Sequence, residues 1–169
     1  MARFRPLILG FLAVAFLAVA PPAFADRAQA IQGSMDVVTT FEAPPPPATP
    51  LPLELIGAGL ASISNHPGEF TVELDFDLNI DRTGHPSTFA GVISFTSKTS
   101  PNDVLYGYFF GHYTSPVNFV ATIIFDGGTG LYAKASGSAE LTGTDVAGPF
   151  AFHADFDGVL KLKGAKGKD

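Results

Sequence analysis

Apolar and polar residues alternate along much of this chain, most clearly over residues 69–79. There, polar and mostly acidic residues separate five apolar ones: Phe70, Val72, Leu74, Phe76 and Leu78. Successive side chains of a strand point to opposite faces, so this pattern predicts a strand with one buried and one solvated face. Comparable patterns predict strands over 34–41, 53–64, 88–96, 104–113, 118–125, 131–141 and 150–162.

A glycine-rich turn separates two of these predicted strands. The apolar residues 123–125 lead into Asp126-Gly127-Gly128-Thr129-Gly130. Glycine adopts positive φ without steric cost, so this segment predicts a tight reversal or a bulge. Beyond it, apolar or small residues, Gly137 among them, occupy every second position from 131 to 141. The alternation predicts a strand that begins at Leu131, with Leu131 on the buried face and Tyr132 on the solvated face.

The number of strands and the short turns between them predict the fold class. Beyond residue 25 the sequence has no convincing helical periodicity, and twelve of its sixteen phenylalanines lie there, spread over nearly every strand. Many short strands with regular spacing favour an antiparallel sandwich or barrel, and closing the sheet removes exposed edges. We predict an all-β fold, a single antiparallel barrel of about eight strands over 34–163. Its interior is filled by side chains or holds one small ligand.

The first 25 residues have the three parts of a secretory signal peptide. Two arginines precede an apolar run over 7–20, and Ala23-Phe24-Ala25 is a small-x-small cleavage site. The run is shorter than the roughly 20 residues of a membrane-spanning helix. We therefore predict cleavage after Ala25, an exported protein in the periplasm or outside the cell, and no membrane span in the mature chain. Residues 26–33 are predicted to be a loose N-terminus.

Composition narrows the class of partner. The formal net charge is −6 before the arginines of the signal segment are removed, so a nucleic-acid partner is not expected. Without cysteine the fold has no disulfides and depends on its core. Six prolines in 44–52 predict a stiff, extended connection between two strands. Residues 164–169 form a short basic tail that we expect to be solvated.

No set of polar residues has a catalytic or metal-binding signature. The segment 75–81 begins like a calcium loop but lacks the glycine and the glutamate of that motif. His153 and Asp155 share one face of the last strand, where an acid–base pair is expected to lie outside the barrel. Tyr106, Tyr108 and His112 share a face of the 104–113 strand and are the candidate residues of a ligand cavity. We expect no metal and no cofactor, and whether the protein is an enzyme stays open.

One segment resembles a known family. Residues 125–143 (Phe-Asp-Gly-Gly-Thr-Gly-Leu-Tyr-Ala-Lys-Ala-Ser-Gly-Ser-Ala-Glu-Leu-Thr-Gly) resemble a hairpin of plant dirigent proteins and, more loosely, of allene oxide cyclases. The similarity looks closest to small exported bacterial members of this group. Residues 91–96 and 106–111 also suit it. The resemblance implies a calycin-type barrel of eight antiparallel strands with an apolar lumen that holds or steers a hydrophobic small molecule. It also implies a homo-oligomer, a trimer in the plant families.

In this resemblance the glycines of the hairpin, Gly127, Gly128, Gly130 and Gly137, carry over as structural positions. The polar cavity residues of the plant families have no assigned counterparts here. Three functions therefore stay open: binding of a hydrophobic molecule, an isomerase or cyclase acting in an apolar cavity, and a structural or surface barrel with a filled core. A cavity with a buried polar group favours the enzyme, a dry apolar cavity favours binding, and no cavity favours the structural barrel.

Overall fold

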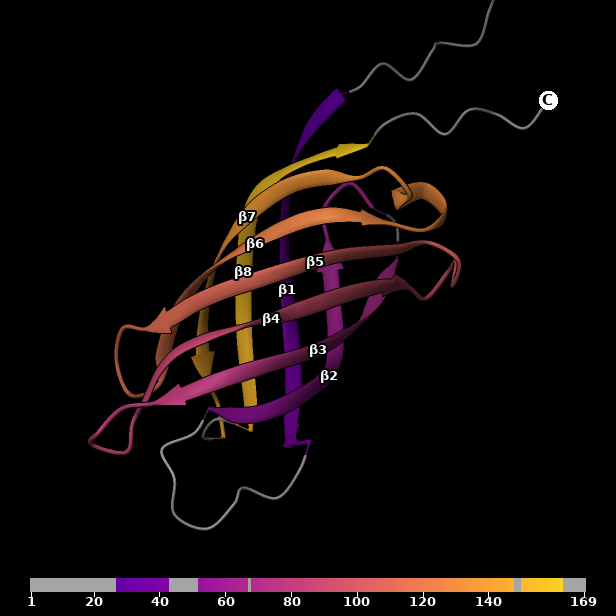
Figure 1. The fold of residues 1–169 in the computed structure, drawn as a ribbon. Helices are drawn as coiled ribbons and strands as arrows, with labels where there is room; N and C mark the ends of the chain where they lie inside the picture. Colours follow the sequence, from indigo (N-terminus) through magenta and orange to yellow (C-terminus); the bar gives the residue numbers. More distant parts are fainter. Residues whose placement is uncertain (1–26, 43–51, 67, 148–149, 163–169) are drawn as a thin grey trace, which may run out of the picture.

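The chain folds into a closed barrel of eight antiparallel strands (Figure 1). The computed structural model describes residues 27–42, 52–66, 68–147 and 150–162. The strands are β1 (Arg27–Phe41), β2 (Leu53–Ile63), β3 (Glu69–Ile80), β4 (Pro86–Ser97), β5 (Val104–Tyr113), β6 (Asn118–Gly128), β7 (Ser136–Asp145) and β8 (Ala151–Leu162). Each strand pairs with the next, and β8 pairs with β1. The predicted fold class is confirmed. The predicted signal segment, the basic tail and all of the proline-rich connection except Pro52 lie outside the described residues.

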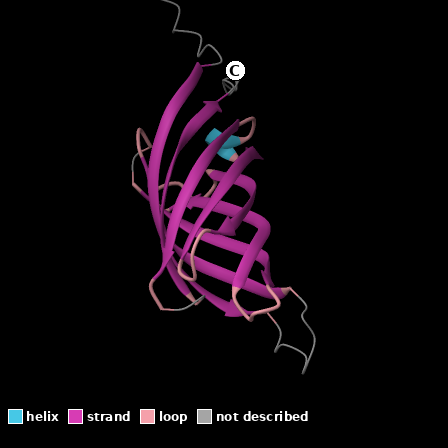
Figure 2. Ribbon diagram, turned by 90° about the vertical axis from the view of Figure 1, so that its left-hand side faces the viewer, coloured by secondary structure: helices cyan, strands magenta, loops and turns pink. Residues whose placement is uncertain are grey.

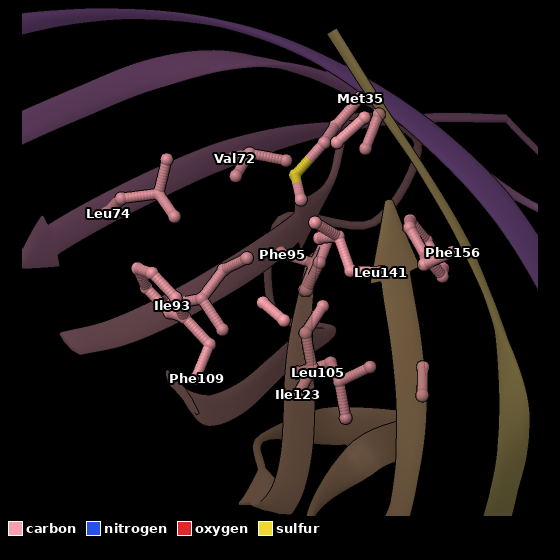
Figure 3. Packing of buried hydrophobic residues seen from close by; sticks show 14 of the residues in the cluster. Met35, Val72, Leu74, Ile93, Phe95, Leu105, Phe109, Ile123, Leu141 and Phe156 are labelled. Atoms are coloured by element: carbon pink, nitrogen blue, oxygen red, sulfur yellow. The ribbon is translucent and has the colours of Figure 1, made fainter. Parts of the chain in front are cut away.

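Apolar side chains fill the interior of the barrel, as the alternation predicts. In β3 the predicted inward residues are buried or partly buried, whereas Glu69, Glu73 and Asp77 are exposed. Rings from distant strands meet in the middle (Figure 3), where the centroid of Phe95 lies 6.0 Å from that of Phe156. The core is therefore continuous across the barrel.

Glycine and phenylalanine face each other across neighbouring strands inside the barrel. The register sets seven such pairs: Phe76 with Gly91, Phe109 with Gly91, Phe89 with Gly111, Phe125 with Gly107, Phe119 with Gly143, Phe125 with Gly137, and Phe156 with Gly33. A Cβ atom added at Gly111 would lie 2.6 Å from Cζ of Phe89, and one added at Gly143 would overlap the ring of Phe119. The glycines thus make room for rings, so most of the interior is filled by side chains.

The N-terminal prediction is wrong, because residues 27–33 are not loose. They form the first half of β1 and pair with β8, from Arg27 opposite Leu162 to Gly33 opposite Phe156. Ile31 is fully buried there. The segment has little periodicity of its own, and the strand that orders it lies at the other end of the chain.

The predicted start of the strand after the glycine turn is also wrong. The β7 strand begins at Ser136, and residues 130–132 form a short 3-10 helix, η1 (Gly130–Tyr132). Gly127 and Gly130 do have positive φ, 103° and 54°. The turn reverses the expected exposure, because Tyr132 is buried while Leu131 is 49% exposed. The ring of Tyr132 packs near that of Phe70, so the turn covers the interior instead of extending the sheet.

The two ends of the barrel differ. The β2–β3, β4–β5 and β6–β7 connections lie at the end that carries η1 (Figure 2), which we call the η1 end. The β3–β4 and β5–β6 connections lie at the opposite end, which we call the cavity end because the apolar cavity described below lies nearer to it. Within the described part of the chain, no helix is long and apolar enough to cross a membrane.

Candidate functional site

An apolar cavity occupies the half of the barrel nearer the cavity end. Its walls are five phenylalanines, Tyr113 and seven aliphatic residues: Phe76, Phe89, Phe109, Phe119, Phe152, Met35, Leu74, Leu78, Ile93, Ala121, Ile123 and Leu141. The free space for a water-sized molecule is about 30 Å³. That is room for about one or two waters, so any larger guest must displace side chains.

Four aromatic rings contact one another near the rim of this cavity. Phe119 contacts Phe89 and Phe152 edge to face, with ring centroids 5.5 and 5.4 Å apart, and Tyr113 at 5.5 Å. Such contacts stabilise a pair by about 0.5–1.5 kcal/mol beyond area burial. Apolar guest surface that replaces them can recover a similar free energy.

A polar pair stands at the rim of this cavity. Tyr113 ends β5 and Asp145 ends β7, and both positions belong to the inward-facing register of their strands. The Tyr113 hydroxyl donates to the two Asp145 carboxylate oxygens, at 3.2 and 3.1 Å. Burial, with the nearby carboxylate, raises the pKa of Tyr113. Burial also raises the pKa of Asp145 to about 6, although the hydrogen bond from Tyr113 acts in the opposite direction.

Asp145 is unusual among the inward-facing residues. At the inward strand positions whose side chains the structure describes, the other residues are apolar or carry neutral polar groups, namely Gln29, Thr39, Ser87, Ser97 and Tyr113. Asp145 is therefore the one ionisable carboxyl group among them. It stands directly opposite Phe152, a cavity residue, in the β7–β8 register.

The η1 end is closed by a buried polar network. Nδ1 of His66 lies 2.8 Å from the Tyr132 hydroxyl, and its Nε2 lies 2.8 Å from Nε2 of Gln29. The Gln29 amide nitrogen can only donate, so His66 accepts at Nε2 and donates from Nδ1 to Tyr132. Burial lowers the pKa of His66, which fits this neutral form, and burial together with Asp103 raises the pKa of Tyr132 to about 12.

The candidate cavity residues named from the sequence do not line the cavity. Tyr106, Tyr108 and His112 lie on the outer face of β5, where both tyrosines are nearly half exposed, so their predicted place in the lumen is wrong. The opposite face of β5 turns inward instead and carries Phe109, which is 7% exposed. The glycines of this face explain why it lies inside: Gly111 leaves room for the ring of Phe89, whereas a face of tyrosines would overfill the interior.

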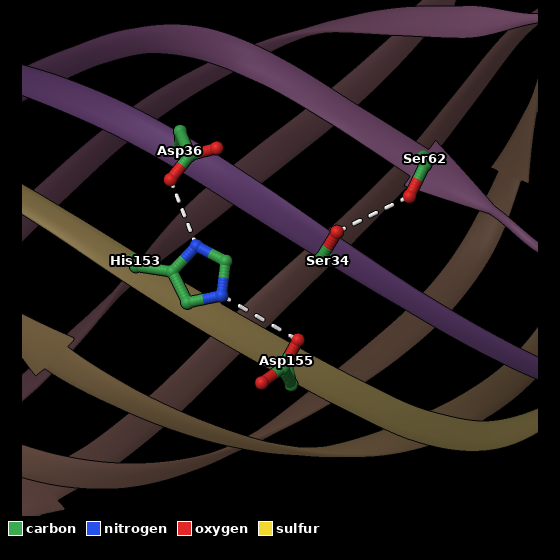
Figure 4. A network of polar contacts seen from close by, with 5 residues as sticks. All are labelled: Ser34, Asp36, Ser62, His153 and Asp155. Atoms are coloured by element: carbon green, nitrogen blue, oxygen red, sulfur yellow. Dashed lines mark hydrogen bonds and ion pairs between the residues drawn. The ribbon is translucent and has the colours of Figure 1, made fainter.

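The His153 and Asp155 pair lies outside the barrel, as the sequence predicts (Figure 4). His153 Nδ1 donates to Asp36 at 2.8 Å, and its Nε2 lies 3.6 Å from an Asp155 oxygen. The hydrogen bond to Asp36 is the main cause that raises the pKa of His153. Asp36 comes from β1 and was not foreseen. The three side chains face solvent, away from the cavity, and His153 lies between the two carboxylates as a small surface cluster.

Sequence reasoning missed both Tyr113 and Asp145. A signal was present, because Asp145 continues the small and apolar series Gly137, Ala139, Leu141 and Gly143. An ionisable residue at a position where the strand otherwise places small or apolar residues is unusual, and such residues often belong to functional sites. In the described part of the chain, no three His, Asp or Glu side chains are grouped so that they could hold a metal ion.

The fold and the cavity define the class of protein: a small, closed, eight-stranded antiparallel barrel with an apolar interior. Comparison of the chain with protein-family models, curated proteins and solved structures found no match.

Proposed function

We propose that this protein is an exported barrel that binds or steers a hydrophobic small molecule in its lumen, entering from the cavity end. The main support is the apolar cavity, which is lined almost entirely by phenylalanine and aliphatic side chains and has the Tyr113–Asp145 pair at its rim. Most ligand sites combine such walls with a few polar groups that orient the guest. The η1 end is plugged by Tyr132 and His66, which leaves the cavity end as the entrance.

Export and the family resemblance support the same proposal. The segment 1–25 has the pattern of a secretory signal, and the closed eight-stranded barrel is the fold that the resemblance to dirigent proteins and allene oxide cyclases implies. Membership of that family, and the homo-oligomer it implies, stay predictions.

A second candidate function is an isomerase or cyclase acting in the same cavity. Tyr113 and Asp145 are a hydroxyl and a carboxyl group with raised pKa values at the edge of an apolar space, which is the environment of many proton-transfer sites. A third candidate is a structural barrel, which the small free volume of the cavity favours.

The first experiment is native mass spectrometry of the protein purified from its own host. A co-purifying apolar molecule supports the proposal, and the same spectrum reports the number of subunits. Turnover of that molecule would favour the enzyme. An empty protein that also shows no thermal shift with a panel of lipids and terpenoids would contradict binding and favour the structural barrel.

A matched pair of variants locates the binding. Ala121→Leu fills the cavity from β6, whereas Ala90→Leu makes the same change on the exposed face of β4. We expect Ala121→Leu to weaken binding at least tenfold and Ala90→Leu to leave it unchanged. Equal binding by both variants would place the ligand outside the lumen and overturn the proposal.

A further inference from the structure

The cavity has one feature that a purely apolar ligand does not explain. Asp145 places a carboxylate at the rim, in the inward register, with Tyr113 as its hydrogen-bond partner. Burying a charged group costs free energy unless it is paired, so the fold keeps this residue at some cost. We propose that the ligand is an amphiphile with a protonated amine, whose apolar body fills the cavity while its ammonium group pairs with Asp145. This inference rests on the proposed function.

The hydrogen bonds of Asp145 leave room for such a group. An ionised carboxylate offers about four acceptor positions, whereas a single Tyr113 hydroxyl approaches both oxygens, at 3.2 and 3.1 Å. Among the described residues, Asp145 forms no ion pair with a lysine, arginine or histidine. An ammonium group supplies both the missing charge and up to three donors.

The rings at the rim favour a cation as well. Tyr113 is hydrogen-bonded to the carboxylate, and Phe152 stands opposite Asp145 in the β7–β8 register. The ring of Phe119 contacts both of these rings. The faces of aromatic rings attract cations, and more strongly where water is excluded. A fatty acid or a phosphate would instead bring a second negative charge to Asp145. The raised pKa of Asp145 agrees with a carboxylate whose charge is not compensated by the protein.

The experiment compares three probes with one chain and different head groups: decylamine, decanol and decanoate, each below its micellar concentration. Binding to the mature protein is measured by titration calorimetry at neutral pH. We expect the amine to bind at least tenfold more tightly than the alcohol and decanoate to bind most weakly. Asp145→Asn should remove the preference for the amine and leave decanol binding within about twofold.

Control variants separate this site from general attraction of amines to an acidic protein. Asp155→Asn removes the same charge from the outer face and should leave all three affinities unchanged. Tyr113→Phe keeps the carboxylate and removes its donor, so the preference for the amine should persist or increase. Ala121→Leu should weaken all specific binding. Melting curves followed by circular dichroism establish that each variant is folded.

The outcomes distinguish the two proposals. If decanol binds in the cavity as tightly as decylamine, or if Asp145→Asn retains the preference for the amine, the amine proposal is wrong and lumen binding stands. If none of the three probes binds the wild-type protein, or if Ala121→Leu leaves every affinity unchanged, both proposals fail for these ligands.

Discussion

Replacing Gly143 with alanine tests whether the facing glycines and phenylalanines set the packing of the barrel. A Cβ atom at this position would lie 2.8 Å from Cε1 of Phe119 and still closer to two other atoms of the ring. All three nearest atoms belong to that side chain, so the ring must move. Phe119 is in ring contact with Phe89, Tyr113 and Phe152, so its displacement disturbs the whole rim of the cavity.

The expected magnitude combines two opposing effects. Overpacking a close-packed core costs about 1–3 kcal/mol. Replacing glycine in a strand recovers about 0.5–1 kcal/mol, because alanine loses less backbone entropy on folding. We therefore expect Gly143→Ala to lower the free energy of unfolding by about 1–2 kcal/mol, which lowers the urea midpoint by roughly 0.5–1 M.

Urea unfolding followed by near-ultraviolet circular dichroism is a suitable assay, because the chain has four tyrosines and no tryptophan. Thr142→Ala, on the exposed face of the same strand, is the control and should change stability by less than about 0.5 kcal/mol. Adding Phe119→Leu to Gly143→Ala should cost less than the sum of the two single changes by at least about 0.5 kcal/mol. Additive costs, or a Gly143→Ala variant as stable as the wild type, would refute the packing explanation.

Three further predictions concern the polar groups. Tyr132→Phe leaves the buried Nδ1–H of His66 without a partner and should cost about 1–2 kcal/mol in urea unfolding, against less than about 0.5 kcal/mol for the exposed Tyr108→Phe. The pKa of Asp145 is about 6 in the folded protein against a usual value of 3.8, so its contribution to the free energy of unfolding is present below about pH 4 and is lost as the pH rises to about 6. Asp145→Asn should remove that part of the pH dependence. Identical stability–pH profiles for the wild type and the variant would contradict the burial of the carboxyl group. The hydrogen bond to Asp36 holds the pKa of His153 above its usual 6.5, so the small stabilisation that this pair gives the fold is lost as the pH rises through the folded pKa. In an NMR titration, Asp36→Asn should lower the pKa of His153, with a change in stability of at most about 1 kcal/mol. An unchanged pKa would exclude the hydrogen bond.

The alternating sequence determined most of the fold. The five inward residues of β3 are apolar and the outward ones polar, so the buried face of that strand follows from a period of two alone. Eight such segments without a helix between them led to the closed barrel. The place of His153 and Asp155 on the outer surface also followed from the alternation, because apolar residues occupy the other face of β8.

Where both faces of a strand are apolar, the sequence does not select the inner one. In β5, one face has three aromatic rings and a histidine, and the other has two glycines beside Leu105, Phe109 and Tyr113. Apolar or aromatic side chains on both faces leave the choice open in the sequence, but the barrel interior has a fixed volume and already holds rings from β4 and β6. The face with glycines is the one that fits, so Tyr106, Tyr108 and His112 lie outside.

Contacts between residues far apart in the chain determined the features that the alternation did not predict. Residues 27–33 became a strand because β8 lies beside them, and Tyr132 became buried because the turn at Gly130 directs it over Phe70. Tyr113 and Asp145 lie 32 positions apart in the chain and meet only because β5 and β7 are both one strand away from β6. The sequence thus determined which residues alternate, whereas closure of the barrel determined which of them meet, because register and interior volume are properties of the whole sheet.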